Sequence, residues 1–259
     1  MHAIPRCKQG NVLGNERVSV TWKYPKAMPI SRRLFMQVGA LAAATGLIGP
    51  ELNESATAAT GDITHGPRSK PLVALTFHGG GDPANAHALL KIFRRTTTPV
   101  SVFAIGTWLQ ANPELAALII DGGHDIGNHT MHHYQMKALS AKKVDSEILG
   151  CAHELKKLIG NQGAWFRPSG TQYSTTLIQK SALKHGYKRC ISYDVDSKDY
   201  LDPGKSAVIA NTMARVKNGS IISLHFGHKG TVEAMPTLIE ELHAKGFTPV
   251  SLKTLLGSK

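Results

Sequence analysis

Strand-like and helix-like segments alternate along most of this chain, and this alternation restricts the fold more than any other feature. Short apolar segments indicate strands at residues 71–77, 99–105, 124–127, 164–166, 190–194, 220–225 and 247–250. Apolar residues at helical spacing lie between them, around 89–93, at 113–120, from 140 onward, and at 175–184, 206–216 and 232–242. Such alternation implies parallel strands covered by helices. We therefore predict an α/β fold, a closed or nearly closed barrel, with no internal repeat or linker between residues 70 and 256.

The N-terminal region has the features of an export signal. Arg32 and Arg33 precede an Ala- and Gly-rich stretch at residues 38–50, and a small-x-small cleavage site follows at residues 56–58. This pattern resembles a twin-arginine signal peptide. The apolar stretch is shorter than the ~20 residues that a membrane span needs. We therefore expect an exported protein without a stable membrane span.

The domain organisation follows from this interpretation. Residues 1–58 form the N-terminal region with the signal, residues 59–69 a linker, and residues 70–259 the folded domain. Met28 would open a more ordinary signal peptide than Met1, so both are candidate start residues.

Charge and cysteine content exclude few partners. The formal net charge is +12, which suits an anionic partner such as a cell-wall polymer, or simply a basic solvated surface. Basic residues are not interleaved with aromatics, so nucleic acid is not an expected partner. Cys151 lies in an apolar helical stripe and is expected in the core, and an exported protein permits a disulfide with Cys190 without requiring one. The oligomeric state stays unknown.

Side chains that can bind a metal or transfer protons follow the predicted strands. His129 and His133 have the i, i+4 spacing that places two imidazoles on one face of a helical turn, where they can share a divalent cation. Strand ends also carry His78, Arg167 and His225, and Asp82, Asp194, Asp196 and Asp199 lie nearby in the sequence. Active residues of βα barrels gather at the carboxyl ends of the strands. We therefore expect one functional rim.

Together these segments resemble the polysaccharide deacetylases of the NodB-homology type, over roughly residues 70–255. The motifs that carry the resemblance are Gly122-Gly123-His124-Asp125-Ile126-Gly127-Asn128, the histidine pair, and Gly219-Ser220-Ile221-Ile222-Ser223-Leu224-His225. The resemblance implies a distorted (β/α)7 barrel and a metal-dependent hydrolase that removes acetyl groups from N-acetylated, sometimes O-acetylated, sugars.

The resemblance also implies roles for single residues. His129 and His133 match the metal ligands, Arg167 the arginine that orients the base, and His225 the general acid. Asp196 and Tyr200 match a motif that usually ends in Trp, with Tyr200 expected at the substrate. Leu224 matches a wall of the acetyl pocket. If Asp196 bonds to His225, it would hold that imidazole in its acid form.

The chain departs from the family at the first strand, where Thr76-Phe77-His78-Gly79-Gly80 replaces the usual Thr-Phe-Asp-Asp-Gly. Both the usual base and the third metal ligand are missing, and catalytic zinc generally has three protein ligands. His78 either completes a three-histidine zinc site or acts as the base, with Asp82 or water filling the metal shell. We favour the ligand role, because a metal-bound water needs little help from a base.

Two other functions remain open. The missing aspartates are compatible with an exported glycan-binding pseudoenzyme, although the other motif residues all stand. Hydrolysis of a different non-peptide C–N bond is the third alternative. The sequence names neither the glycan nor the metal, for which zinc is the first candidate.

Overall fold

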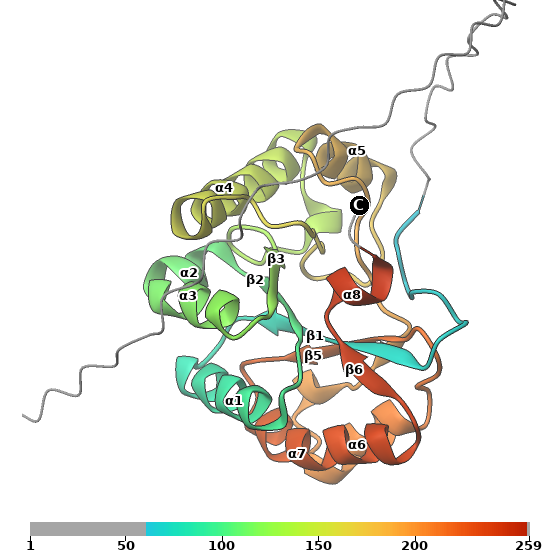
Figure 1. Ribbon diagram of the computed structural model, residues 1–259. Coiled ribbons are helices and arrows are strands. Elements are labelled where there is room, and N and C mark those ends of the chain that lie inside the picture. The colour runs from blue at the N-terminus through green and yellow to red at the C-terminus, as the bar shows by residue number, and fades with distance from the viewer. Residues whose placement is uncertain (1–60, 258–259) are drawn as a thin grey trace, which may run out of the picture. The chain divides into compact units, whose positions relative to one another are not determined.

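The computed structural model describes residues 61–257 and places a mostly parallel sheet among surrounding helices (Figure 1). Its strands are β1 (Leu72–Gly79), β2 (Ser101–Ala104), β3 (Asp125–Asn128), β4 (Val195–Asp196), β5 (Ile221–His225) and β6 (Thr248–Val250). Their order is β3-β2-β1-β5-β4, all neighbouring pairs are parallel, and β6 pairs with the start of β1. The predicted α/β architecture is confirmed.

Two predicted strands are reduced to single bridges. Phe166 bridges in parallel to Asn128 on one side and to Cys190 on the other, and Ile191 bridges to Ile63. The strands predicted at 164–166 and 190–194 therefore occupy the expected places but contribute one or two residues each. These bridges continue the sheet beyond β3.

The helices follow the strands in the predicted alternation. They are α1 (Pro83–Thr96), α2 (Gly106–Ala111), α3 (Pro113–Asp121), α4 (Ala141–Ile159), α5 (Thr176–Lys184), α6 (Lys205–Met213), α7 (Lys229–Ala244) and α8 (Leu252–Leu256), with 3-10 turns η1 (Met136–Ala138) and η2 (Asp199–Leu201). Asp82 is the N-cap of α1, since its Oδ1 accepts a hydrogen bond from the backbone N–H of Ala84 at 2.9 Å. Pro83 follows at the first helical position, where its missing N–H costs nothing.

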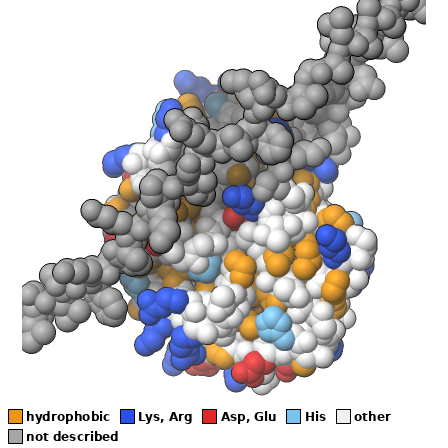
Figure 2. Space-filling model, in the orientation of Figure 1, with side chains coloured by type: hydrophobic (Ala, Val, Ile, Leu, Met, Phe, Trp, Pro, Cys, Tyr) orange, Lys and Arg blue, Asp and Glu red, His pale blue; other side chains and the backbone are white. Residues whose placement is uncertain are grey.

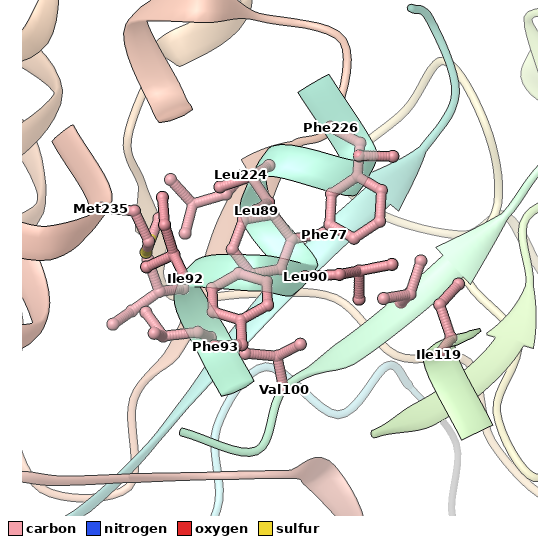
Figure 3. Close-up of a cluster of buried hydrophobic side chains, with 14 of the residues drawn as sticks. Phe77, Leu89, Leu90, Ile92, Phe93, Val100, Ile119, Leu224, Phe226 and Met235 are labelled. Atoms are coloured by element: carbon pink, nitrogen blue, oxygen red, sulfur yellow. The ribbon is translucent and has the colours of Figure 1, made fainter. Parts of the chain in front are cut away.

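The main core lies between the sheet and the helices α1, α3 and α7 (Figure 3). Phe77 of β1 contacts the rings of Phe93 and Phe226, each 5.2 Å away between centroids. Leu224 of β5 is fully buried in this cluster beside Met235. Because side chains alternate along a strand, burying Leu224 against the helices turns its neighbour His225 the other way.

Several other expectations can be compared with the described residues. No helix among them is long and apolar enough to cross a membrane. Cys151 and Cys190 are both buried and unpaired, and Cys151 is in the core as predicted. Lys and Arg side chains lie in separate groups on the face shown in Figure 2, among apolar and uncharged ones. The twin-arginine signal, the candidate starts and residues 59–60 of the expected linker lie outside the described residues. Residues 61–69 of that linker are described, and they include Ile63 and His65, which form bridges to Ile191 and Ser220.

Candidate active site

Parallel pairing brings the predicted site residues to one edge of the sheet. His78 is paired in register with His225 of β5 and with Phe103 of β2, and His129 directly follows β3. Arg167 follows the bridge at Phe166, and its backbone N–H donates to Asn128 O at 3.0 Å. The structure therefore brings together His78, His129, His133, Arg167 and His225, as the rule of strand ends predicts.

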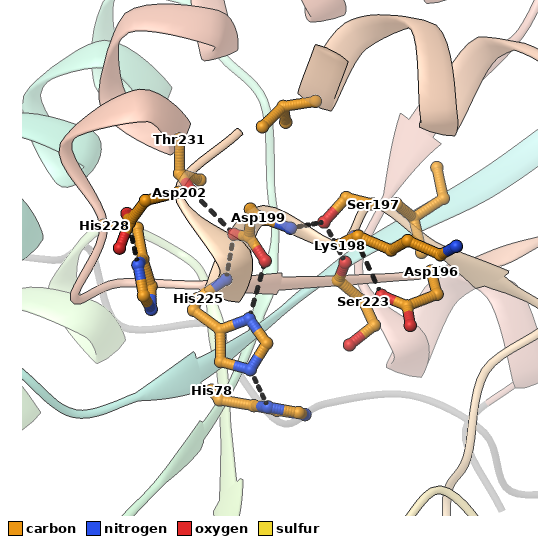
Figure 4. A network of polar contacts seen from close by, with 12 residues as sticks. His78, Asp196, Ser197, Lys198, Asp199, Asp202, Ser223, His225, His228 and Thr231 are labelled. Atoms are coloured by element: carbon orange, nitrogen blue, oxygen red, sulfur yellow. Dashed lines mark hydrogen bonds and ion pairs between the residues drawn. The ribbon is translucent and has the colours of Figure 1, made fainter. Parts of the chain in front are cut away.

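A chain of hydrogen bonds runs from Arg167 to Asp199 through two histidines (Figure 4 shows the part from His78). Nη1 of Arg167 lies 3.1 Å from Nε2 of His78. Nδ1 of His78 lies 2.7 Å from Nε2 of His225, and Nδ1 of His225 lies 2.7 Å from Oδ1 of Asp199.

The ends of this chain determine where its protons are. A guanidinium only donates, so Nε2 of His78 must accept and the proton of His78 sits on Nδ1. That N–H donates to Nε2 of His225. The proton of His225 is then on Nδ1 and is donated to the Asp199 carboxylate. In this state neither nitrogen of His78 has a free lone pair.

Burial explains why His78 is neutral beside a cation. Arg167 is fully buried, and burial lowers the pKa of its guanidinium to about 9, so it stays charged at neutral pH. Its other hydrogen bonds go to the backbone carbonyls of Ile191 and Ser192, at 3.2 and 3.0 Å, and it lies 4.2 Å above the Phe103 ring. The pKa of His78 is well below its usual value because of burial first, then because of the charges of His129, His225 and Arg167.

His129 and His133 present the nitrogen donors that suit a divalent cation. Nδ1 of His129 donates to the Arg167 carbonyl at 2.9 Å, which leaves the lone pair on Nε2. This Nε2 is buried and has no partner among the described residues. The ring of His133 is 5.0 Å from that of His129, and burial lowers the pKa of both imidazoles, which favours the neutral, ligating form.

The structure does not support His78 as the third metal ligand. Both of its nitrogens are engaged, and its ring stacks on that of His129 with the planes only 23° apart, so the in-plane lone pairs of the two rings do not converge. Within residues 61–257 no three His, Cys, Asp or Glu side chains form a metal-binding group. The two histidines fit a cation with two protein ligands. His78 is also not placed as the base that the other alternative expected, because neither of its nitrogens is free to take a proton; the geometry makes it a hydrogen-bond donor to His225.

The residue that holds His225 is Asp199, where the sequence pointed to Asp196. Oδ2 of Asp199 accepts from the backbone N–H of His225 at 2.7 Å and from Oγ1 of Thr231 at 2.6 Å, in addition to the ring contact. Asp196 instead accepts from the backbone N–H of Lys198 at 2.9 Å. Burial alone would raise the pKa of Asp199, but its hydrogen bonds from His225 and Thr231 lower it, so the carboxylate is charged.

The remaining predicted positions differ in their relation to the site. Tyr200 is 46% exposed and its ring lies 5.6 Å from that of His225, which suits contact with a substrate. Leu224 is packed in the core, so its expected role as a pocket wall stays a prediction that the packing does not favour. Asp82 is a helix cap, and Asp194 binds Arg68 at 2.7 Å and the start of β5, so neither lies in the hydrogen-bond chain.

Comparison with known proteins shows which family the chain belongs to. The family model for polysaccharide deacetylase matches residues 65–190. A peptidoglycan-N-acetylglucosamine deacetylase from Bacillus cereus is 31% identical over 197 residues, which are 74% of this chain and 92% of that protein. The fold of a CE4 family pseudoenzyme from Bacillus anthracis superposes with a TM-score of 0.71 at 24% identity, over 76% of this chain and 69% of the other. A solved peptidoglycan N-acetylglucosamine deacetylase gives the same TM-score at 25% identity, over 75% of this chain and 92% of the other. The chain belongs to the polysaccharide deacetylase family, hydrolases of the amide C–N bonds of acetylated glycans.

Proposed function

We propose that this protein is an exported, metal-dependent deacetylase that removes acetyl groups from N-acetylated, or O-acetylated, cell-wall or extracellular polysaccharide. The observation that carries the proposal is the chain Arg167–His78–His225–Asp199 beside a buried, unpartnered Nε2 of His129. This hydrogen-bond chain orients the imidazole of His225 for acid–base catalysis. Next to it, His129 and His133 supply nitrogen lone pairs that can bind a cation.

Nε2 of His225 is the atom that transfers the proton. Asp199 holds both the backbone and Nδ1 of His225, so only Nε2 can take up a proton, and the side chain is 21% exposed. When substrate and water enter, His78 releases this nitrogen. Nε2 then removes one proton from the attacking water and delivers it to the leaving nitrogen as the acetyl C–N bond breaks. The products are acetic acid and a free amino sugar.

His78 acts as a hydrogen-bond donor in this scheme. The hydrogen bond from Arg167 keeps the His78 proton on Nδ1. Before substrate binds, this N–H donates to Nε2 of His225 and orients its ring. Once substrate is bound, the same N–H donates to the reacting oxygen. A donor aimed at a developing negative charge stabilises the transition state most where water is excluded. Tyr200, exposed beside His225, supplies an apolar face for a sugar ring.

His129 and His133 would hold the divalent cation, for which zinc is our first candidate. When bound, the cation supplies Lewis-acid polarisation of the acetyl carbonyl. Neutral imidazoles are suitable ligands, and the Arg167 carbonyl orients His129 from the far side of its ring, as hydrogen-bonded partners of metal-binding histidines usually do.

The twin-arginine pattern at Arg32 and Arg33 supports export, and the deacetylase relatives support a glycan as the substrate. A basic protein suits the anionic surface of a cell wall.

One observation favours a second candidate, a glycan-binding protein without catalysis. His78 is occupied by two hydrogen bonds, so the cation would have only two protein ligands. A pseudoenzyme with the same fold is also known.

The two candidates separate in one experiment on the purified full chain. Acetate release and the dissociation constant are measured on the same N-acetylglucosamine oligomers, with and without added zinc, for wild type and His225→Ala. The deacetylase predicts zinc-dependent acetate release that His225→Ala abolishes. Binding of the oligomers with no acetate release under any condition would establish the second candidate.

A further inference from the structure

The loop that carries the histidine pair has a conformation that needs support from outside. Thr130 and His133 both have left-handed backbone angles, with φ of 70° and 59°. For residues other than glycine such angles cost ~1 kcal/mol or more each and persist only where surrounding contacts impose them.

Most of the supporting contacts lie at the start of the loop. The backbone N–H of Thr130 donates to Oδ1 of Asn128 at 2.8 Å, and the Thr130 hydroxyl lies 2.9 Å from that of Ser169. The carbonyls of Thr130 and Met131 accept from the first backbone N–H groups of α2, at 3.0 and 2.9 Å. These bonds fix the chain up to Met131.

Glu147 of α4 holds the residue before His133, while the Ser169 hydroxyl holds the residue after it by donating to the Tyr134 carbonyl at 2.7 Å. Oε2 of Glu147 accepts from the backbone N–H of His132 at 2.8 Å, and its Oε1 accepts from Nδ1 of His132 at 2.9 Å. Lys143, one turn earlier on the same helix, lies 3.1 Å from Oε1. Glu147 has no solvent exposure. A buried carboxylate is destabilising unless its oxygens accept hydrogen bonds. Both oxygens of Glu147 accept from His132, the residue before His133.

We propose that Glu147 is a positioning residue for the His129/His133 pair: by holding His132 from outside, it sets the direction of the His133 imidazole. This rests on the proposed function in so far as the pair binds a cation. The ring of His132 is thereby turned toward α4, where it stacks on Tyr134 at 5.4 Å, while the ring of His129 stacks on His78. His132 and His133 are adjacent in the sequence, but in this proposal His132 anchors the loop to α4 and His133 faces the cation.

The test compares Glu147→Ala with Glu154→Ala in the full chain. Glu154 is a matched control because it lies on the same helix, is 7% exposed, and bonds to Gln110 at 3.0 Å, away from the loop. Two quantities are measured: the affinity for Zn²⁺ alone, by competition with a chelating dye, and the hydrogen-exchange rate of the His132 backbone amide in metal-free protein.

We expect Glu147→Ala to weaken zinc binding ~10-fold or more, in the range seen for residues that orient metal ligands, and to speed exchange of the His132 amide. Glu154→Ala should change neither quantity, even if it lowers the melting temperature. Glu147→Gln, which keeps one acceptor for the His132 amide, should fall in between, and it replaces the alanine variant if that variant does not fold.

Wild-type zinc affinity in Glu147→Ala would overturn the inference, even if exchange of the His132 amide is faster. If wild type itself binds no zinc, the metal part of the proposed function fails. The exchange measurement then still decides whether Glu147 holds His132: unchanged exchange of the His132 amide refutes this contact, and faster exchange supports it.

Discussion

The replacement Asp199→Asn tests the hydrogen-bond chain, because it changes one atom at its end. The carboxylate receives three hydrogen bonds of 2.6–2.7 Å, two of them at Oδ2. An asparagine can keep its carbonyl oxygen at the Oδ2 position and still accept from His225 N–H and Thr231. Its amide group then faces Nδ1 of His225.

This amide group donates, so Nδ1 of His225 must give up its proton and Nε2 must carry it. Nε2–H then points at Nδ1–H of His78. Moving the His78 proton to Nε2 only transfers the conflict to Arg167, which also donates. One donor-to-donor contact remains wherever the protons are placed, so the variant loses one buried hydrogen bond.

Leaving a buried donor unsatisfied costs about 1–3 kcal/mol, and we expect Asp199→Asn to lose that much stability in urea denaturation at pH 7. We expect turnover to fall by about 10²–10⁴, as when a histidine is held in the wrong tautomer in a serine protease triad. Asp194→Asn is the control, since Asp194 also receives several hydrogen bonds, from Arg68, Ser220 and the Ile221 N–H, but lies outside the chain. It should lose stability and keep turnover. A stable and active Asp199→Asn protein would refute the proton positions.

Three further outcomes are expected. The folded-state pKa of Asp199 is lower than its usual value, so its contribution to stability is complete above pH ~4 and is lost as pH falls through the folded-state pKa; acid titration of Asp199→Asn should therefore show a flatter decline in stability below pH 4 than wild type. Leu224→Ala removes a fully buried core side chain and should cost about 2–5 kcal/mol in thermal or urea unfolding, and a cost below 1 kcal/mol would mean that Leu224 is not packed as in Figure 3. Arg167→Lys keeps the charge but loses the planar group that reaches His78, Ile191 O and Ser192 O together, so acetate release should fall at least tenfold; wild-type rates would contradict this.

Much of the fold and part of the site follow from the sequence. Strand-to-helix alternation and the rule of strand ends place His78, His129, Arg167 and His225 together, because parallel strands in register end on one edge. The strands expected near residues 164–166 and 190–194 shrink to bridges. An apolar segment shows that these residues are buried, but it does not show how many of them pair with a neighbouring strand.

Asp199 and Glu147, the two acids that hold histidines, are harder to predict from the sequence. Asp199 lies only three residues after Asp196, the acid that the sequence favours. The left-handed turn at Lys198 and the 3-10 turn after it direct Asp199, and not Asp196, to His225. Glu147 lies on the buried side of α4, next to Ile148 and one turn after Val144. A helical pattern presents such an acid as a polar position, and its burial becomes apparent only when the loop that it binds is in place.

The role of His78 decides between the two arrangements of this site, and the nitrogen spectra of its ring measure that role directly. In long-range proton–nitrogen NMR of ¹⁵N-histidine-labelled protein, we expect His78 to carry its proton on Nδ1 and His129 to have a free Nε2. Adding zinc should shift the nitrogens of His129 and His133 and leave both nitrogens of His78 in place. A zinc-dependent shift at a His78 nitrogen, or a proton on its Nε2, would contradict the hydrogen-bond chain and restore the three-histidine metal site.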